Sequence, residues 1–540
     1  LMKHLLIAGG LLCATLAVPA VAHTAPDPTD STAQRYVDWH HADPQHDAQP
    51  GVSTTRAYEF ARRRQPRTVV VAIIDSGVDV DHEDLRDNIW QNAGEVPSNG
   101  LDDDGNGYVD DVHGWNFLGN ADGENIEWET LELTRLFRRY RPEFEGKTAD
   151  QVPAGRREAF AEYERVRAEY DRKLAESREE LSMIEQLMQV QEVTHQIVTK
   201  ALQSETYTAA DLRALPADDE VVGQAAAFLL SLIENDIKMD ELREAYEHYG
   251  TLVNYQLNLE YDPRAEIIGD DPTRLGDAYG NNDVVGGDPE HGTHVAGIVA
   301  AARANGMGLD GIATDVRVMV LRAVPNGDER DKDIANAIRY AVDNGAHIIN
   351  MSFGKSYSPE KSLVDEAVQL AEARGVLLVH AAGNEAENVD RVRVYPNDDL
   401  SGRDAPAGNW LSVGATSIEV GPEFVADFSN WGRRGVDLFA PGVDIYSTLP
   451  GGGYGLNSGT SMAAPVVSGV AALVWAYYPE LTATQLRDVL LRSAVPYRPR
   501  VRRPTDEGKP KRVRFKRLSA TVGVVNAYAA MQLAERPVGK

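Results

Sequence analysis

The chain has 540 residues, and its 83 acidic against 54 basic side chains give a net charge of −29 at pH 7. Apolar residues make up 43% and charged residues 25%, which excludes a disordered chain. Only one apolar stretch is long enough to consider as a membrane segment, which excludes an integral membrane protein. The acidic excess makes the chain a poor general binder of nucleic acid, so we expect no nucleic-acid partner.

The N-terminus has the features of a secretory signal peptide. Lys3 and His4 give a short basic start, an apolar run follows, and Ala20-Val21-Ala22 fits a small-x-small cleavage site. The run is too short for the alternative, a membrane anchor. We therefore predict a signal peptide over residues 1–22, no transmembrane anchor, and export to the periplasm or the cell exterior. The single cysteine, Cys13, lies within this segment, so the exported chain would have no disulfides.

Residues 23–50 are rich in Pro, Asp, His and Gln and show no periodicity, which predicts an extended N-terminal arm. Three histidines of this arm could ligate a metal, but a solvated linker is the favoured interpretation. These are His40, His41 and His46.

Residues 51–120 form the first part of the predicted catalytic domain. A short helix is expected over 52–64. The β-branched run over 68–74 predicts a buried parallel strand, apolar on both faces, that ends at Asp75.

Residues 121–270 differ in composition and predict a helical insertion. They are rich in Glu, Arg, Ala, Leu and Gln, and segments 156–200 and 221–249 have the pattern of amphipathic helices. This block holds 33 acidic and 17 basic residues, a net of −16 and more than half of the chain's excess charge.

Residues 271–535 predict the second part of the catalytic domain. Apolar strands over 316–321, 347–352, 375–382 and 410–415 alternate with helix-like stretches, and a strand fragment and a helix close the chain. This alternation predicts an α/β fold with a doubly wound, mostly parallel sheet. The basic segment 498–517 has ten Lys or Arg against two acids. This segment could be a solvated charged hairpin. It could equally be a surface that contacts the acidic insertion, an anionic cell envelope or a trimming protease.

Three motifs carry the chemistry. Asp75 ends a buried strand at the sheet edge where ligands of open α/β folds collect. His291 falls at the start of a small-residue helix with the sequence HVAGIVAAA, and Ser461 stands in Gly-Thr-Ser-Met-Ala at another helix start. Small residues there let a substrate backbone approach, and a helix N-terminus favours developing negative charge.

An aspartate, a histidine and a serine in this chain order occur in the serine-protease triad of subtilisin. With the strands between them, these motifs make the chain resemble the subtilisin-like serine proteases, the subtilases. The resemblance implies that Ser461 is the nucleophile, that His291 is the general base and then the acid, and that Asp75 orients the imidazole. It also makes His294 a structural residue of the helix.

The resemblance further implies an oxyanion hole made by the Asn384 side chain and the backbone N–H of Ser461. It implies two segments that bind an extended peptide and wall the first specificity pocket. Phe353 stands where a smaller residue is common, so it either narrows the pocket or faces the core. The expected segments are Ser352, Phe353 and Gly354, and Ala381, Ala382 and Gly383.

The acidic loop 102–110 predicts a structural calcium site. It has oxygen side chains at relative positions 1, 3, 5 and 9 and glycine at 6, the spacing of an EF-hand-like loop. Position 12 is His113 instead of glutamate, so a compact loop is expected and not a helix–loop–helix unit. The alternative is a solvated acidic turn. The predicted ligands are Asp102, Asp104, Asn106, the Tyr108 carbonyl and Asp110. The resemblance implies a second calcium site at Asp84 and Asn305.

We therefore expect an exported serine endopeptidase that forms an acyl-enzyme with protein or peptide substrates. The alternative is a non-catalytic protein that keeps the fold but is occluded by its insertion. An esterase is disfavoured because the Gly-x-Ser-x-Gly elbow is missing. The insertion is expected to act as a lid or exosite, with a passive ornament as the alternative. Too few residues precede the catalytic domain for a folded propeptide, and no oligomeric state is predicted.

Overall fold

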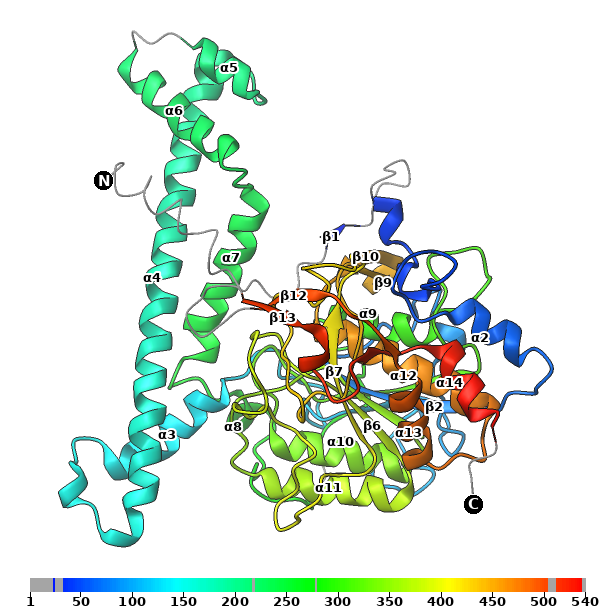
Figure 1. The fold of residues 1–540 in the computed structure, drawn as a ribbon. Helices are drawn as coiled ribbons and strands as arrows, with labels where there is room; N and C mark the ends of the chain where they lie inside the picture. Colours follow the sequence, from blue (N-terminus) through cyan, green and yellow to red (C-terminus); the bar gives the residue numbers. More distant parts are fainter. Residues whose placement is uncertain (1–22, 25–32, 216–218, 277–278, 504–510, 537–540) are drawn as a thin grey trace. The chain divides into compact units, whose positions relative to one another are not determined.

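The structure, a computed structural model, describes residues 23–24, 33–215, 219–276, 279–503 and 511–536. The predicted signal peptide, residues 1–22, lies outside the described residues. The described chain divides into two compact units (Figure 1). One is the helical unit, Leu133–Tyr261, and the other is the α/β unit, formed by the chain on either side of it.

Within the described residues, the α/β unit is built on a nine-stranded sheet. Neighbouring strands are parallel except at one edge, where β11 runs antiparallel to β14. This confirms the predicted α/β fold with a mostly parallel sheet. In spatial order, the strands are β11 (Val495–Pro496), β14 (Gly523–Val524), β8 (Leu438–Pro441), β7 (Trp410–Thr416), β6 (Leu377–Ala381), β5 (Ile348–Met351), β2 (Val69–Asp75), β4 (Val316–Arg322) and β3 (Gly114–Asn116).

Helices cover both faces of this sheet because its strands are apolar on both faces. In β2, Val69, Val71 and Ile73 join one core, while Ala72 and Ile74 join the other. The second core is covered by α10 (Asp331–Asp343) and α11 (Lys361–Arg374). The first is covered by α2 (Thr54–Ala61), α9 (Glu290–Ala300), α12 (Thr460–Tyr477), α13 (Ala483–Ser493) and α14 (Ala527–Ala534).

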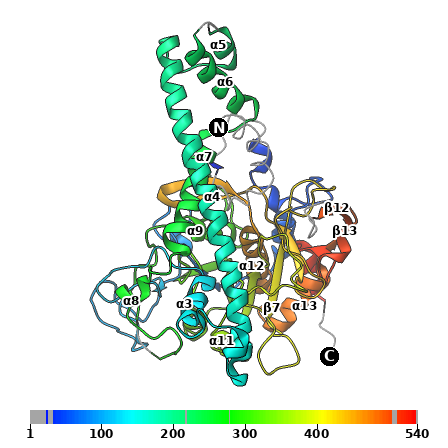
Figure 2. The ribbon, with the colours of Figure 1, turned by 90° about the vertical axis from the view of Figure 1, so that its left-hand side faces the viewer.

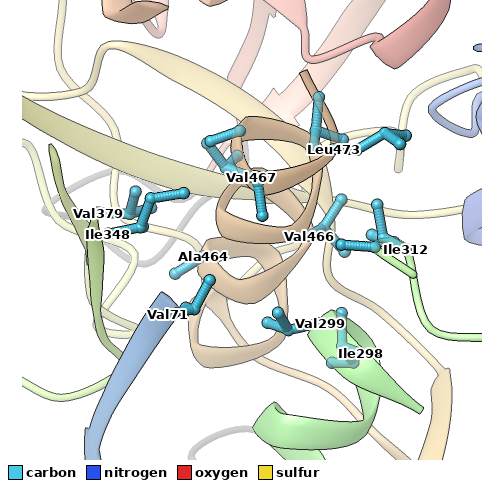
Figure 3. Packing of buried hydrophobic residues seen from close by; sticks show 14 of the residues in the cluster. Val71, Ile298, Val299, Ile312, Ile348, Val379, Ala464, Val466, Val467 and Leu473 are labelled. Atoms are coloured by element: carbon cyan, nitrogen blue, oxygen red, sulfur yellow. The ribbon is translucent and has the colours of Figure 1, made fainter. Parts of the chain in front are cut away.

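Helix α12 lies at the centre of the first core. Figure 3 shows Val71, Ile348 and Val379 of the sheet on one side of it and Ile298, Val299 and Ile312 on the other. By length and hydropathy α12 passes as a membrane span, but 94% of its 18-residue window is buried inside the protein. Its apolar character therefore fits a core helix. Because α12 is buried in this way, its first residues, including Ser461, are held at a fixed position at the edge of the sheet.

Two small antiparallel sheets complete the α/β unit. In one, β10 (Gly453–Asn457) pairs with β9 (Ile445–Leu449) and with β1 (His23–Thr24). In the other, β12 (Arg500–Arg503) pairs with β13 (Lys511–Arg514), so the described ends of the basic segment form a hairpin.

The helical unit is organised around α4 (Arg157–Leu202), whose 46 residues span about 69 Å. α6 (Glu220–Glu234) and α7 (Met239–Thr251) pack along it, as both views show (Figure 1, Figure 2). The segment 221–249, predicted to be helical, forms these two helices, because the chain turns at Asp236, which has a φ of 53°. The remaining helices are α3 (Glu132–Phe144), α5 (Ala209–Ala214) and, beyond this unit, α8 (Pro263–Ile267).

The interpretation of the N-terminal arm as a solvated linker was wrong for residues 39–43, of which all but Ala42 are buried. The side chains of Trp39, His40 and His41 are buried in the α/β unit, whereas His46 is exposed. His41 bonds Thr54 Oγ1 at 2.9 Å and the Asp310 carbonyl at 2.6 Å. The three histidines do not form a metal-ligating cluster within the described residues.

Candidate active site

The end of β2 and the start of α9 bring Asp75 and His291 together. The Asp75 side chain is buried, and its Oδ1 lies 2.7 Å from His291 Nδ1 and accepts the Ser76 N–H at 2.8 Å. Gly292 makes this approach possible, since a Cβ there would lie 2.0 Å from the Gly77 carbonyl oxygen. The carboxylate fixes the imidazole with Nδ1 toward it and Nε2 free to face outward.

The electrostatics of His291 favour its charged form. Burial alone would lower its pKa, but the charge of Asp75 and the hydrogen bond to it outweigh burial and raise the pKa above its ordinary value. Asp288 and Glu290 act in the same direction. His294, one turn later, is different: burial lowers its pKa to about 3, and its Nε2 lies 3.0 Å from the Ile445 carbonyl oxygen.

Ser461 is the second residue of α12. Its hydroxyl donates to the Ser352 carbonyl at 3.0 Å, and the Ser352 hydroxyl donates back to the Ser461 carbonyl at 2.8 Å. In the described residues the Ser461 hydroxyl thus bonds the Ser352 backbone and not His291. Catalytic hydrogen bonds are often long or misaligned before substrate binds, so this geometry is compatible with a nucleophile at rest.

Asn384 lies beside the start of α12. Its Oδ1 accepts from both the backbone N–H and the hydroxyl of Thr460, each at 2.9 Å. A Cβ on Gly459 would lie 3.6 Å from Asn384 Nδ2 and 3.5 Å from the Ser461 nitrogen. Two N–H donors therefore flank one small space at a helix N-terminus, where negative charge is favoured.

The two segments expected to bind peptide follow adjacent parallel strands, β5 and β6, in which Met351 pairs with His380. Ser352, Ala381 and Ala382 are buried, while Gly354 is exposed. The Phe353 ring is half-buried, lies at an edge-to-face angle 6.3 Å from the His380 ring and packs against the second core. Phe353 was expected either to narrow the pocket or to face the core, and this packing favours the second interpretation.

The acidic loop differs from the predicted calcium geometry. Asp102 and Asp110 use their carboxylates to accept backbone N–H groups of the same turns. Within the described residues, the only carboxylates that meet as a potential ligand cluster are those of Glu95, Asp104 and Asp111, with oxygens within 4.8 Å of one another.

Of the three predicted carboxylate ligands, only Asp104 is in this cluster. Asn106 is a neighbour, because its amide donates to Asp104 and Asp111. The Tyr108 ring packs against Trp115 and Tyr340. Glu95 and Asp111 stand outside the motif positions, and this is why the loop spacing alone did not reveal them.

The second predicted pair does meet. Asn305 donates to the Asp84 carboxylate at 2.6 Å, and the Leu309 N–H and Tyr454 hydroxyl lie 3.4 and 3.5 Å from its other oxygen. Asp84 is 1% exposed.

Sequence reasoning missed Arg322, which ends β4 beside Asp75. Its Nε donates to the Ser76 carbonyl at 2.9 Å, and the residue is 2% exposed. An arginine at the end of a buried strand, at the same edge as the candidate aspartate, was the signal available in the sequence.

The sequence matches the subtilase family over residues 66–524. It is 37% identical over 232 residues to the cell wall-associated protease of Bacillus subtilis (strain 168), covering 43% of this chain and 24% of that protein. It is 42% identical over 185 residues to the thermophilic serine proteinase of Bacillus sp. (strain AK1), covering 34% and 42%.

A third relative is the major intracellular serine protease of Bacillus subtilis (strain 168), 38% identical over 228 residues, with 41% of this chain and 67% of that protein covered. The matched stretches span less than half the length of the first two relatives.

Proposed function

The chain belongs to the subtilase family, and from this premise we propose that it is an exported serine endopeptidase with Asp75, His291 and Ser461 as its triad. The observation that carries the proposal is the 2.7 Å contact between Asp75 and His291, with Ser461 at the N-terminus of α12 on the same sheet edge. The catalytic domain comprises residues 51–120 and 271–535, and residues 121–270 are inserted between its aspartate and histidine.

The mechanism follows from these groups. His291 Nε2 removes the hydroxyl proton of Ser461 as Oγ bonds to the scissile carbonyl carbon, and Asp75 stabilises the imidazolium. The carbonyl oxygen becomes an oxyanion between Asn384 Nδ2 and the Ser461 N–H. His291 then returns the proton to the leaving amine, the C–N bond breaks, and an acyl-enzyme remains. Water, deprotonated by His291, attacks the acyl carbon and releases the carboxylic acid and Ser461.

The substrate is an extended polypeptide. Residues 352–354 follow the end of β5, and Gly354 is exposed, so a substrate strand would pair with their backbone by β-augmentation. Residues 381–383 wall the first specificity pocket from the neighbouring strand. Both contacts use main-chain groups, which suits an enzyme that cleaves many protein sequences.

Calcium is the proposed structural cofactor. The donor set at Glu95, Asp104 and Asp111 consists only of carboxylate oxygens, the ligands that calcium prefers, and Asp111 is fully buried. Asp84 and the Asn305 side chain form the second proposed site. In both places the ion would neutralise carboxylates and hold a loop of the α/β unit, without entering the chemistry.

A fluorophosphonate probe tests the proposal, because it reacts only with an activated serine. The purified exported chain should be labelled, Ser461→Ala should not, and labelling should fall in chelator if calcium maintains the site. Absence of labelling in every condition would refute the endopeptidase and favour an occluded binding protein. Export would be contradicted if the protein were recovered from the cytoplasm with its N-terminal segment intact.

A further inference from the structure

A buried ionic cluster lies at the end of the proposed substrate strand. Lys355 directly follows Gly354, and its side chain is 1% exposed. Its ammonium contacts Glu132 Oε2 at 2.9 Å, Asp331 Oδ1 at 2.9 Å and the Glu329 carbonyl at 2.7 Å. An ammonium group has three protons, so these three acceptors satisfy it completely.

One ammonium faces two carboxylates in the cluster, and each carboxylate residue has further hydrogen bonds. Glu132 and Asp331 are themselves buried, and each has further donors: the Glu132 N–H bonds Asp328, and Asp331 accepts from the Ser358 hydroxyl and the Glu360 N–H. Burial raises the pKa of Glu329 to about 8, which keeps its carboxyl largely neutral at pH 7. Removing either partner of such a buried ion pair leaves an uncompensated charge, so the pair resists separation.

The cluster fixes one end of a short span. The Lys355 backbone is held separately, by two hydrogen bonds of 2.9 Å with Tyr395. At the other end, Ser352 is locked to Ser461 by the reciprocal bonds described above. Phe353 and Gly354 therefore lie between two fixed residues: Ser352, which is bonded to Ser461 of α12, and Lys355.

We propose that Lys355 is a positioning residue for peptide binding: the Lys355–Glu132 ion pair holds the backbone of Phe353 and Gly354 in the register that an extended substrate requires. This inference rests on the proposed function. Lys355 touches neither the triad nor the pocket, and it acts through the strand that it terminates. Glu132 is the first residue of α3, so the strand is tied to the point where the chain enters the helical unit.

The test uses Glu132→Gln in the full chain, which keeps the side-chain shape and an acceptor but removes the charge. A matched control is Asp270→Asn, since Asp270 is similarly buried and pairs with Arg264 and Lys332, but has no contact with residues 352–355. Both variants lose one carboxylate charge from a buried pair, so both should lower the melting temperature.

Three readouts separate positioning from stability. For a chromogenic tetrapeptide anilide, we expect Glu132→Gln to raise KM five- to tenfold with kcat within twofold, and Asp270→Asn to leave KM within twofold. Fluorophosphonate labelling, which needs no peptide strand, should stay within twofold in both. In the Ser461→Ala background, Glu132→Gln should weaken binding of fluorescein-labelled casein by the same five- to tenfold.

Equal changes in KM and casein affinity in the two variants, or no change in Glu132→Gln, would overturn the proposal. The casein measurement needs no catalysis. If the wild-type chain is not labelled, the proposed endopeptidase fails, and the difference in casein affinity between the two variants still decides the role of Lys355.

Discussion

Replacing His40 with leucine should make the protein more resistant to acid. The His40 ring is fully buried, and both of its nitrogens are without a hydrogen-bond partner among the described residues. Burial lowers its pKa well below the ordinary value, and the nearby His41 and Arg303 lower it further. In the folded protein His40 therefore stays neutral at pH values where the unfolded chain takes up a proton.

The sign and size of the effect follow from this difference. The free energy of unfolding is unaffected by the titration of His40 above the pKa of a histidine in the unfolded chain, about 6.5. Below that pH it falls by about 1.4 kcal/mol per pH unit for one histidine. Between pH 7.5 and 5 the ring thus removes about 2 kcal/mol from the free energy of unfolding. Leucine has no proton to bind, so His40→Leu should lose about 2 kcal/mol less than the parent over this interval.

Urea unfolding measures this loss, followed by tryptophan fluorescence in a Ser461→Ala background that prevents self-cleavage. Trp39, beside the substituted residue, is buried and contributes to this signal. His46→Leu is the control, because His46 lies in the same arm but is exposed, and it should leave the acid dependence unchanged. The reasoning fails if His40→Leu and its parent lose equal stability between pH 7.5 and 5.

Two further predictions concern the site and the calcium loop. Because Asp75 raises the pKa of His291, kcat/KM should fall as the pH is lowered, with a midpoint above 6.5. Asp75→Asn should slow the reaction and move that midpoint to a lower pH. A pH–rate profile in which the variant has an unchanged midpoint would contradict this. Calcium at 100 times its Kd should stabilise the protein by about 2.7 kcal/mol, and Asp111→Asn should remove most of that gain in thermal melts with and without chelator, whereas Asp102→Asn, outside the cluster, should retain it.

Local patterns in the sequence predicted the sheet because its strands are continuous apolar runs. Residues 69–74 of β2 are all apolar and mostly β-branched, which is typical of a parallel strand covered on both faces. The resemblance to subtilases brought Asp75, His291 and Ser461 together from positions far apart in the chain, and the structure puts Asp75 and His291 in contact.

What the sequence concealed depends on long-range pairing. Lys355 and Glu132 are 223 residues apart and neither belongs to a motif, so no local pattern marks their contact. The same holds for His40 and His41, whose polar surroundings suggested a solvated arm. They are buried because Trp39 packs in the core beside them, and composition averaged over 23–50 hides one aromatic anchor.

Arg330 brings together the two ends of the segment that carries the helical unit. It contacts Glu129 at 2.8 Å and Asp262 at 3.7 Å, so a single guanidinium bridges the residues just before and just after the helical unit. The two points where the chain leaves and rejoins the α/β unit are therefore neighbours. A sheet whose loop begins and ends at one place can gain or lose a whole module there without repairing its own strands, as circular permutation and domain insertion also require. The helices of residues 133–261 thus leave and rejoin the α/β unit at one place, and a short turn across Arg330 would be enough to close the chain without them.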